Sequence, residues 1–197
     1  LLMSKPDLAI FDLDNTILNG DSDYSMINYL VDINLLDEAA KLKNDEFIKD
    51  YQRGQLDFNL YTNFALKPYA GKTQKEINEI ILPFVKTIIE PMINIFALKL
   101  IHDHHDKGDT ILLASATNEL IVKPIAQRLD IHHVIGTKVK FKNNQCSGEF
   151  IPPSALGEGK LKLVKAWMKS HQYDNFSRVT IYSDSINDLP LMEAVEF

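Results

Sequence analysis

The sequence has one cysteine, no long apolar run and no excess of positive charge, and each absence argues against a class of protein. Cys146 has no partner for an internal disulfide or a zinc site, which favours a reducing, cytoplasmic setting. Charged residues and prolines interrupt the most apolar stretch, residues 77–101, so it lacks the roughly 20 consecutive apolar residues of a membrane-spanning helix. The N-terminus is too short and too mixed for a signal peptide. With 21 basic and 27 acidic residues, we expect neither a nucleic-acid nor a membrane surface.

The composition is that of a globular protein. Of the 197 residues, 45% are hydrophobic and 24% are charged, which excludes disordered, collagen-like and coiled-coil chains. This length suits one domain, or one core with a small insertion.

Apolar patterns predict strands and helices in alternation near both ends of the chain. We expect strands at 7–11, 110–114, 134–135 and 179–182, a hairpin over 138–151, and helices at 91–107, 118–129, 160–170 and from 189 to Val195. Between them, residues 22–86 show only helical patterns, one of which opens with capping-box spacing at Thr73–Glu76. The sequence therefore predicts an α/β core, residues 1–19 and 91–197, interrupted by an all-helical insertion, residues 20–90.

Two carboxylates, Asp12 and Asp14, follow the first predicted strand. Residues two apart in an extended chain point the same way, so these side chains would repel each other unless a cation or a shared proton lay between them. Ligands of open α/β sheets bind beyond the carboxyl ends of the strands, which is where this pair lies. The alternative is an ordinary turn, since Asp and Asn favour turns.

Three further groups occupy similar places. Ser115 follows the second buried strand, where a hydroxyl suits an anion but also suits a plain helix cap. Lys160 opens a helix, against the helix dipole, which indicates a negative neighbour unless the side chain is merely solvated. Asp184 and Asp188 follow the strand at 179–182 and would share a face if their turn were helical; the alternative is an Asp- and Asn-rich loop.

A parallel sheet would bring all of these strand ends to one edge. Four acids, a hydroxyl and a lysine together suit a divalent metal and a phosphoryl group, and ligands that are all oxygen favour Mg²⁺.

These motifs resemble the haloacid dehalogenase (HAD) superfamily of phosphotransferases, in the branch that contains phosphoserine phosphatase. The four motifs occur in order: Ile10–Thr16, Leu112–Ser115, Lys160 and Ser183–Asp188. The resemblance covers the whole chain and implies a Rossmann-like core, with a central parallel sheet flanked by helices and a helical cap at 20–90. It implies a Mg²⁺-dependent phosphomonoesterase that forms an aspartyl-phosphate.

The resemblance also implies a role for each motif residue. Asp12 would be the nucleophile and Asp14 the general acid and base. Mg²⁺ would be held by Asp12, the backbone carbonyl of Asp14 and Asp184, with Asp188 in support. Ser115, Lys160 and Asn187 would bind the phosphoryl oxygens.

The sequence departs from the pattern of phosphoserine phosphatases in the cap. Asp21 takes the place of a glutamate that meets the substrate amine, and the one cap arginine, Arg53, has a setting unlike that of the family's carboxylate-binding arginine. The family also continues beyond the fourth motif, whereas this sequence stops at Phe197. We therefore expect a small substrate with a cationic amine near its phosphate, such as phosphoserine or histidinol phosphate, although Asp21 and Asp23 could simply cap a helix.

Two alternatives remain open at this point. A phosphomutase would use the same nucleophile and acid–base group, and a non-catalytic phospho-receiver or binding module could share the fold. Retention of all four motifs argues against the second. The sequence does not indicate an oligomeric state.

Overall fold

A single five-stranded sheet organises the protein, which is described here over residues 5–172 and 176–194 of a computed structural model. The strands are β1 (Leu8–Phe11), β2 (Thr110–Asn118), β3 (His133–Lys142), β4 (Gln145–Ile151) and β5 (Val179–Tyr182). Their order in the sheet is β4-β3-β2-β1-β5. Strands β5, β1, β2 and β3 run parallel, and β4 pairs antiparallel with β3 in a hairpin. Because β1 lies between β2 and β5 and runs parallel to both, these two neighbours end beside the loop that follows it.

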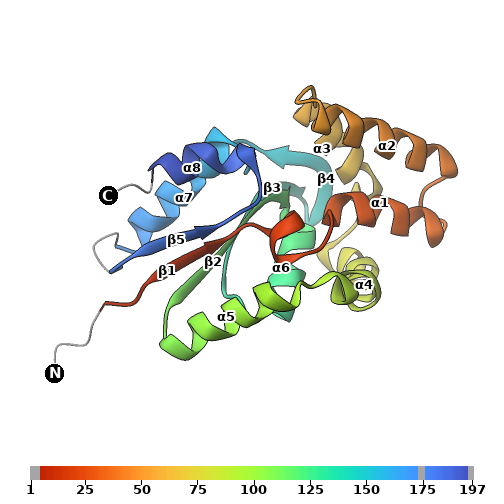
Figure 1. The fold of residues 1–197 in the computed structure, drawn as a ribbon. Coiled ribbons are helices and arrows are strands. Elements are labelled where there is room, and N and C mark those ends of the chain that lie inside the picture. Colours follow the sequence, from red (N-terminus) through yellow and green to blue (C-terminus); the bar gives the residue numbers. More distant parts are fainter. Residues whose placement is uncertain (1–4, 173–175, 195–197) are drawn as a thin grey trace.

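Helices cover both faces of the sheet (Figure 1). They are α5 (Ile95–Lys107) and α6 (Glu119–Arg128) on one face, and α7 (Glu158–Ser170) and α8 (Leu189–Ala194) on the other. Strand β1 is buried on both sides, as its unbroken apolar run predicts. Ala9 and Phe11 pack in the cluster that holds the apolar side chains of α5 and α6, whereas Leu8 and Ile10 pack with those of α7 and α8. The predicted α/β fold, with a central and mostly parallel sheet flanked by helices, is confirmed.

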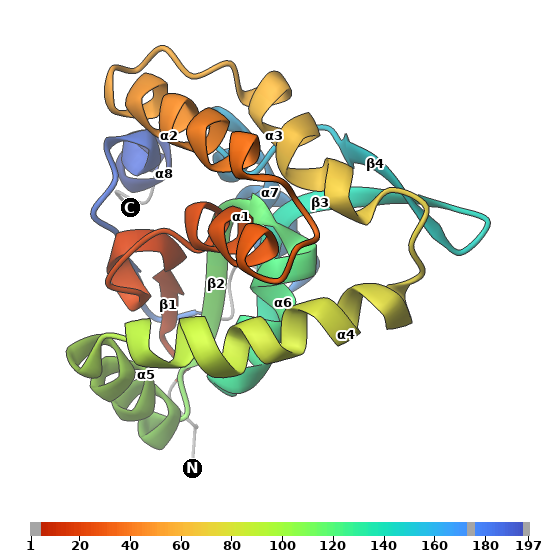
Figure 2. The ribbon, with the colours of Figure 1, turned by 90° about the vertical axis from the view of Figure 1, so that its right-hand side faces the viewer.

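Residues 20–90, which we call the insertion, contain helices and no strand. Its helices are α1 (Ser22–Asp32), α2 (Glu38–Gln52), α3 (Phe58–Leu66) and α4 (Gln74–Phe84). Each begins at a side chain that accepts a backbone N–H: Asp21, Asp37, Asp57 and Thr73 in turn. Thr73 and Glu76 form the predicted capping box. In Figure 2, α1, α2 and α3 stand above the carboxyl end of β1, and α4 continues toward α5.

Backbone hydrogen bonds join the insertion to the rest of the chain at two places. At its base, the two connecting segments pair with each other, since Asn19 N–H donates to the Met92 carbonyl at 2.7 Å. Farther out, the β3–β4 hairpin holds the segment before α4. Gly71 N–H donates to the carbonyl of Cys146, whose own N–H donates to the carbonyl of Lys72, both at 2.8 Å. Residues 22–70, which include α1, α2 and α3, make no backbone hydrogen bond to the sheet among the described residues, and α2 and α3 are the helices of this segment farther along the chain from the base.

Several boundaries differ from the sequence-based predictions. Pro91 lies within a short 3-10 turn, Glu90–Met92, and α5 starts at Ile95 because Asn94 caps it by accepting the N–H groups of Phe96 and Ala97. The strand predicted at 110–114 continues to Asn118, so Ser115 lies within β2 rather than beyond it. The short strand at 134–135 and the first arm of the hairpin are one strand, β3. Helix α7 begins at Glu158, and Val195 lies outside the described residues.

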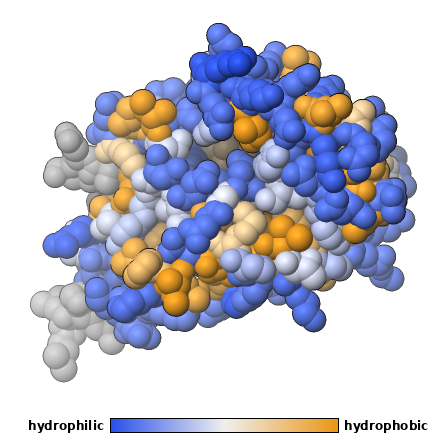
Figure 3. All heavy atoms as spheres, turned by 45° about the vertical axis from the view of Figure 1, so that its right-hand side comes forward, coloured by the Kyte–Doolittle hydropathy of each residue, from blue (hydrophilic) through white to orange (hydrophobic). Residues whose placement is uncertain are grey.

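None of the helices in the described ranges combines the length and apolar character needed to cross a membrane. Polar residues cover much of the face shown in Figure 3, with apolar side chains exposed among them.

Candidate active site

A cavity of about 540 Å³ opens where the carboxyl ends of β1, β2 and β5 face the insertion. Its sheet side includes every motif residue singled out in the sequence: Asp12, Asp14, Ser115, Lys160, Asp184, Asn187 and Asp188. Its other side comes from the insertion and includes Asp21 and Asp23 together with aromatic side chains of α2 and α3. In the space-filling view, the surface is hollowed beneath the upper lobe (Figure 3). The chain thus brings residues from five separate segments, 12–23, 47–61, 115–117, 156–160 and 184–188, to one place.

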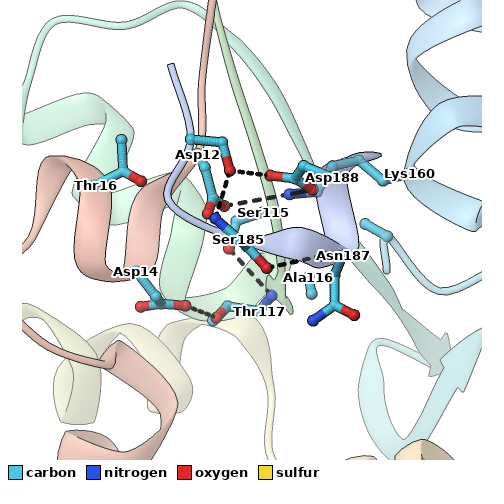
Figure 4. A network of polar contacts seen from close by, with 12 residues as sticks. Asp12, Asp14, Thr16, Ser115, Ala116, Thr117, Lys160, Ser185, Asn187 and Asp188 are labelled. Carbon is cyan, nitrogen blue, oxygen red and sulfur yellow. Dashed lines mark hydrogen bonds and ion pairs between the residues drawn. The ribbon is translucent and has the colours of Figure 1, made fainter. Parts of the chain in front are cut away.

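Lys160 lies between two acids at the sheet edge (Figure 4). Its Nζ is 3.2 Å from Asp12 Oδ1 and 2.8 Å from Asp188 Oδ1, and all three side chains are at least nine-tenths buried. Burial alone would lower the pKa of Lys160, but the charges of Asp12 and Asp188 raise it above its ordinary value, so the amine stays protonated. The anomalous position of Lys160 at a helix start is thereby explained by its two negative neighbours.

Asp12 itself is short of positive charge. Burial raises its pKa, Lys160 lowers it, and the charges of Asp188 and Asp14 raise it again, to about 6. One lysine therefore does not neutralise the acids around it. The side chain of Asp12 comes directly from the end of β1, where the backbone N–H donates to the carbonyl of Tyr182 at 2.9 Å and fixes the loop to β5.

Asp14 is held apart from Asp12 by its own set of donors. The backbone N–H of Ser22 donates to Oδ1 at 2.7 Å, and the Thr117 hydroxyl donates to Oδ2 at 2.8 Å. Burial, followed by the charge of Asp21, raises the pKa of Asp14 to about 7, against the opposing effect of the Ser22 and Thr117 hydrogen bonds. A carboxyl group with such a pKa can both donate and accept a proton near neutral pH.

Asp184 and Asp188 do not share a face, in contrast to the expectation for a helical turn. The loop makes a single 3-10 turn at Ile186–Asp188, which buries Asp188 against Lys160 and Ser183. Asp184 is exposed and accepts a hydrogen bond from the Thr16 hydroxyl at 3.1 Å. Its carboxylate therefore stays available at the cavity, while that of Asp188 is used by the lysine.

Ser115 and Asn187 complete the sheet side. Ser115 is 1% exposed, and its hydroxyl oxygen accepts the N–H of Thr117 at 3.2 Å, which leaves its own proton free to point elsewhere. Asn187 uses its side-chain amide to donate to the hydroxyl of Tyr51 in α2 at 3.0 Å. Ser115, Lys160 and Asn187 thus line one cavity, as donors for an anion would.

On the insertion side, the two acids have different surroundings. Asp21 caps α1 by accepting the N–H of Tyr24 at 2.8 Å, so the helix-cap alternative describes part of what it does. Asp23 does not cap the helix; it accepts from the hydroxyl of Tyr61, and Asn118 donates to it at 3.4 Å, while the proton of the neighbouring Thr117 hydroxyl goes to Asp14. Burial, and then the charges of Asp21 and Asp14, raise the pKa of Asp23 well above its ordinary value.

Several residues of the cavity lining were not predicted as site residues. Thr117, which contacts Asp14, could have been found because it lies two residues after Ser115 on the same strand and hence on the same side. No local pattern marked Tyr51 and Tyr61, because they reach the cavity from α2 and α3. Arg53, set aside from its sequence context, also lines the cavity at an exposed position.

The donor groups fit a magnesium ion in kind. The described carboxylate, histidine and thiol side chains do not gather in threes at metal-binding distance. Mg²⁺, however, commonly takes one or two protein carboxylates and fills its remaining positions with water and substrate phosphate. Asp12, with its raised pKa and incomplete neutralisation, and the available Asp184 meet that requirement.

An open α/β fold whose cavity holds a buried carboxylate beside a lysine, and a second carboxyl group with a raised pKa, has the groups that acid–base and nucleophilic chemistry need. The chain belongs to the family of haloacid dehalogenase-like hydrolases, whose model matches residues 9–193. The prediction of an enzyme of this family, a phosphoric monoester hydrolase, is confirmed by the family match and by its phosphatase-named relatives.

Three similar proteins illustrate the relationship. A histidinol-phosphatase of Neisseria meningitidis is 35% identical over 193 residues, covering 96% of this chain and 87% of its own. A protein of unknown function from Bordetella pertussis superposes with a TM-score of 0.89 at 30% identity, over 98% of this chain and 88% of its own. A phosphoserine phosphatase, solved as an analogue of its phospho-aspartyl intermediate, has a TM-score of 0.65 at 13% identity, over 96% and 83%; this likeness concerns the fold alone.

Proposed function

We propose that the protein is a Mg²⁺-dependent phosphomonoesterase that hydrolyses a small, amine-bearing phosphate ester through an aspartyl-phosphate on Asp12. The observation that carries the proposal is the arrangement of two carboxyl groups in one cavity. Asp12 is paired with Lys160 at 3.2 Å, and Asp14, with a pKa of about 7, faces the same cavity from a separate set of hydrogen bonds.

In the first half-reaction, a carboxylate oxygen of Asp12 attacks phosphorus, and the bond from phosphorus to the ester oxygen breaks. Asp14, in its protonated form, gives its proton to the departing alkoxide, so the alcohol leaves neutral. Lys160, Ser115 and Asn187 donate hydrogen bonds to the phosphoryl oxygens, whose charge is spread out in the transition state.

In the second half-reaction, Asp14 is a carboxylate and takes a proton from water as the water attacks the phosphorus of the aspartyl-phosphate. The bond between phosphorus and Asp12 breaks, inorganic phosphate forms, and both acids return to their starting states. The hydrogen bonds from Ser22 and Thr117 keep Asp14 at a fixed place through both halves. A magnesium ion held by Asp12, the Asp14 carbonyl and Asp184 would supply positive charge to the phosphoryl oxygens.

The substrate class follows from charge and size. Asp21 and Asp23 put negative charge on the insertion side of the cavity, which favours a cation and opposes a second anion. The cavity volume suits a metabolite, and a folded protein or a nucleic acid would not fit between the sheet edge and the insertion. The histidinol-phosphatase relative supports an amino-alcohol phosphate.

Phosphoserine is a second candidate substrate, and Arg53 is the observation that favours it. Arg53 is an exposed residue of the cavity lining, and a guanidinium group there could bind a substrate carboxylate. Histidinol phosphate has no carboxylate, so the two compounds differ in their need for Arg53.

The test is phosphate release from p-nitrophenyl phosphate, histidinol phosphate and phosphoserine by the purified protein. With Mg²⁺ present, we expect release from p-nitrophenyl phosphate and at least one metabolite, and none in excess chelator. Absence of release from all three compounds would favour the phospho-receiver alternative. Transfer of the phosphoryl group to another position of the substrate, in place of free phosphate, would indicate a phosphomutase.

A further inference from the structure

We propose that Asp23, together with Tyr61, is a specificity-determining residue that recognises a second nitrogen-bearing group of the substrate, a flat ring with a protonated or donating nitrogen, farther from the phosphate than the amine. The inference rests on the proposed phosphatase function and names the substrate class of that same cavity. It assigns Asp23 a task different from that of Asp21.

Asp23 is a carboxylate with spare acceptor capacity inside the cavity. An ionised carboxylate has about four lone-pair sites. The side chain receives a hydrogen bond from the hydroxyl of Tyr61 and a long one of 3.4 Å from Asn118, while the proton of Thr117 goes to Asp14. One carboxylate oxygen of Asp21 caps α1, whereas the side chain of Asp23 does not cap a helix.

No fixed cation balances this region. The ion pairs among the described residues involve none of Asp14, Asp21 and Asp23. The groups that face Asp23 are neutral donors from α3 and β2, and acids from the start of α1 and the loop after β1. Asp23 is half-buried, and a partly desolvated carboxylate without an ion-pair partner is unfavourable, so a cation supplied by the substrate would stabilise it.

The walls around Asp23 suit a flat ring. Phe47, Tyr51, Phe58 and Tyr61 all line the cavity from α2 and α3. Phe47 and Tyr61 meet edge to face, with ring centroids 5.4 Å apart. Aromatic faces attract cations and pack against planar rings. The hydroxyl of Tyr61 also donates a hydrogen bond to Asp23. An imidazolium ring could donate a hydrogen bond to the carboxylate of Asp23 and pack against the aromatic side chains around it.

The insertion contains a second tyrosine–aspartate pair, which lies outside the cavity and can serve as a control. The hydroxyl of Tyr24 donates to Asp45 at 2.8 Å, which gives another tyrosine–aspartate hydrogen bond between insertion helices. Neither of these residues lines the cavity. Asp45→Asn therefore reproduces the loss of a hydrogen-bonded carboxylate without touching the proposed ring site.

The experiment compares kcat/KM for three esters: histidinol phosphate, with an amine and a ring; O-phosphoethanolamine, with an amine only; and glycerol phosphate, with neither. Wild type should prefer them in that order. Asp23→Asn should lose about tenfold or more for histidinol phosphate, a loss at least about fivefold greater than for either of the other two esters, while Asp45→Asn leaves all three unchanged. An equal loss on all three esters, or none on histidinol phosphate, would overturn the proposal.

Wild type alone provides a second measurement if Asp23→Asn does not fold. The alcohols histidinol and ethanolamine are compared as inhibitors of glycerol phosphate hydrolysis. The inhibition constant of histidinol should be lower by about tenfold or more, and equal constants would overturn the role of Asp23. Hydrolysis of glycerol phosphate would leave the proposed phosphatase function standing in that case, whereas failure to hydrolyse any ester, p-nitrophenyl phosphate included, would overturn that function as well.

Discussion

The side-chain amide of Asn187, in the loop after β5, donates a hydrogen bond to the hydroxyl of Tyr51 in α2 at 3.0 Å. The two residues are 136 positions apart, and both line the cavity. This contact joins the proposed phosphate-binding loop to the part of the insertion that has no backbone tie to the sheet among the described residues. We therefore expect any opening of the insertion to involve α2 and α3, with residues 71–73 held by the hairpin.

Tyr51→Phe tests this link. Removal of the hydroxyl should cost about 1 kcal/mol of stabilisation in the closed arrangement, since one exposed hydrogen bond is lost. We expect the effect mainly in KM, which should rise severalfold for a small ester, with an unchanged circular dichroism spectrum. The control is Tyr29→Phe in α1, outside the cavity lining. Kinetics of Tyr51→Phe equal to those of this control would show that the link does not matter.

A glycine beside the lysine provides a second prediction. A Cβ at Gly159 would lie 2.0 Å from the carbonyl oxygen of Ser154, a backbone atom that cannot move away cheaply. Gly159→Ala should therefore shift the start of α7 and carry Lys160 away from Asp12, so kcat should fall by about tenfold or more even at saturating Mg²⁺. Lys162→Ala, on the exposed side of α7, is the control. Full activity of Gly159→Ala would contradict this packing.

Asp14 should make stability depend on pH in an unusual direction. Its pKa is about 7 in the folded protein against 3.8 for the free side chain, so the folded state binds more protons between these values. Stability contributed by this group is present below about pH 4 and is lost as the pH rises through 7. Urea unfolding in chelator at pH 4 to 7 should therefore show a smaller decline for Asp14→Asn than for wild type.

The control for that series is Asp103→Asn. The hydrogen bond from Lys99 lowers the pKa of Asp103, so this exposed group has the opposite sign and its removal should not flatten the decline. Identical pH slopes for wild type and Asp14→Asn would contradict the raised pKa of Asp14.

Asp184 should control the response to metal. The carboxylate of Asp184 is exposed at the cavity and accepts a hydrogen bond from the Thr16 hydroxyl, so Asp184→Ala should keep the fold. The variant should raise the Mg²⁺ concentration for half-maximal activity by about tenfold or more. The measurement is a Mg²⁺ titration of phosphate release, with Asp32→Ala on the exposed end of α1 as control. An unchanged midpoint would exclude Asp184 from the metal site.

Much of the fold could be predicted because its signals are local. The apolar run of β1 ends at Asp12, and the capping box at Thr73 marks the start of α4 through residues only three positions apart. Boundaries set by distant contacts could not be predicted in this way. Asn94 begins α5 in place of Pro91 because the preceding residues pair with the segment at Leu18, and no local pattern shows that pairing.

In the site, too, the residues that local patterns mark could be predicted, and those that distant packing positions could not. The sheet topology brings the strand ends together, so Asp12, Ser115 and Lys160 could be placed at one edge from sequence. The insertion side depends on how helices pack over that edge. Tyr61 and Tyr51 therefore could not be placed, and nothing in the sequence separated the cap role of Asp21 from the position of Asp23 beside Tyr61 and Asn118.

The central claim is that Asp12 is the nucleophile. The most direct measurement is phosphate release by Asp12→Asn, because the amide nearly preserves the shape of the side chain but cannot attack phosphorus. We predict a loss of kcat of about a thousandfold or more, an unchanged circular dichroism spectrum, and phosphorylation of Asp12 detected by mass spectrometry in rapidly quenched wild type only. Near-normal turnover by a folded Asp12→Asn protein would contradict the account.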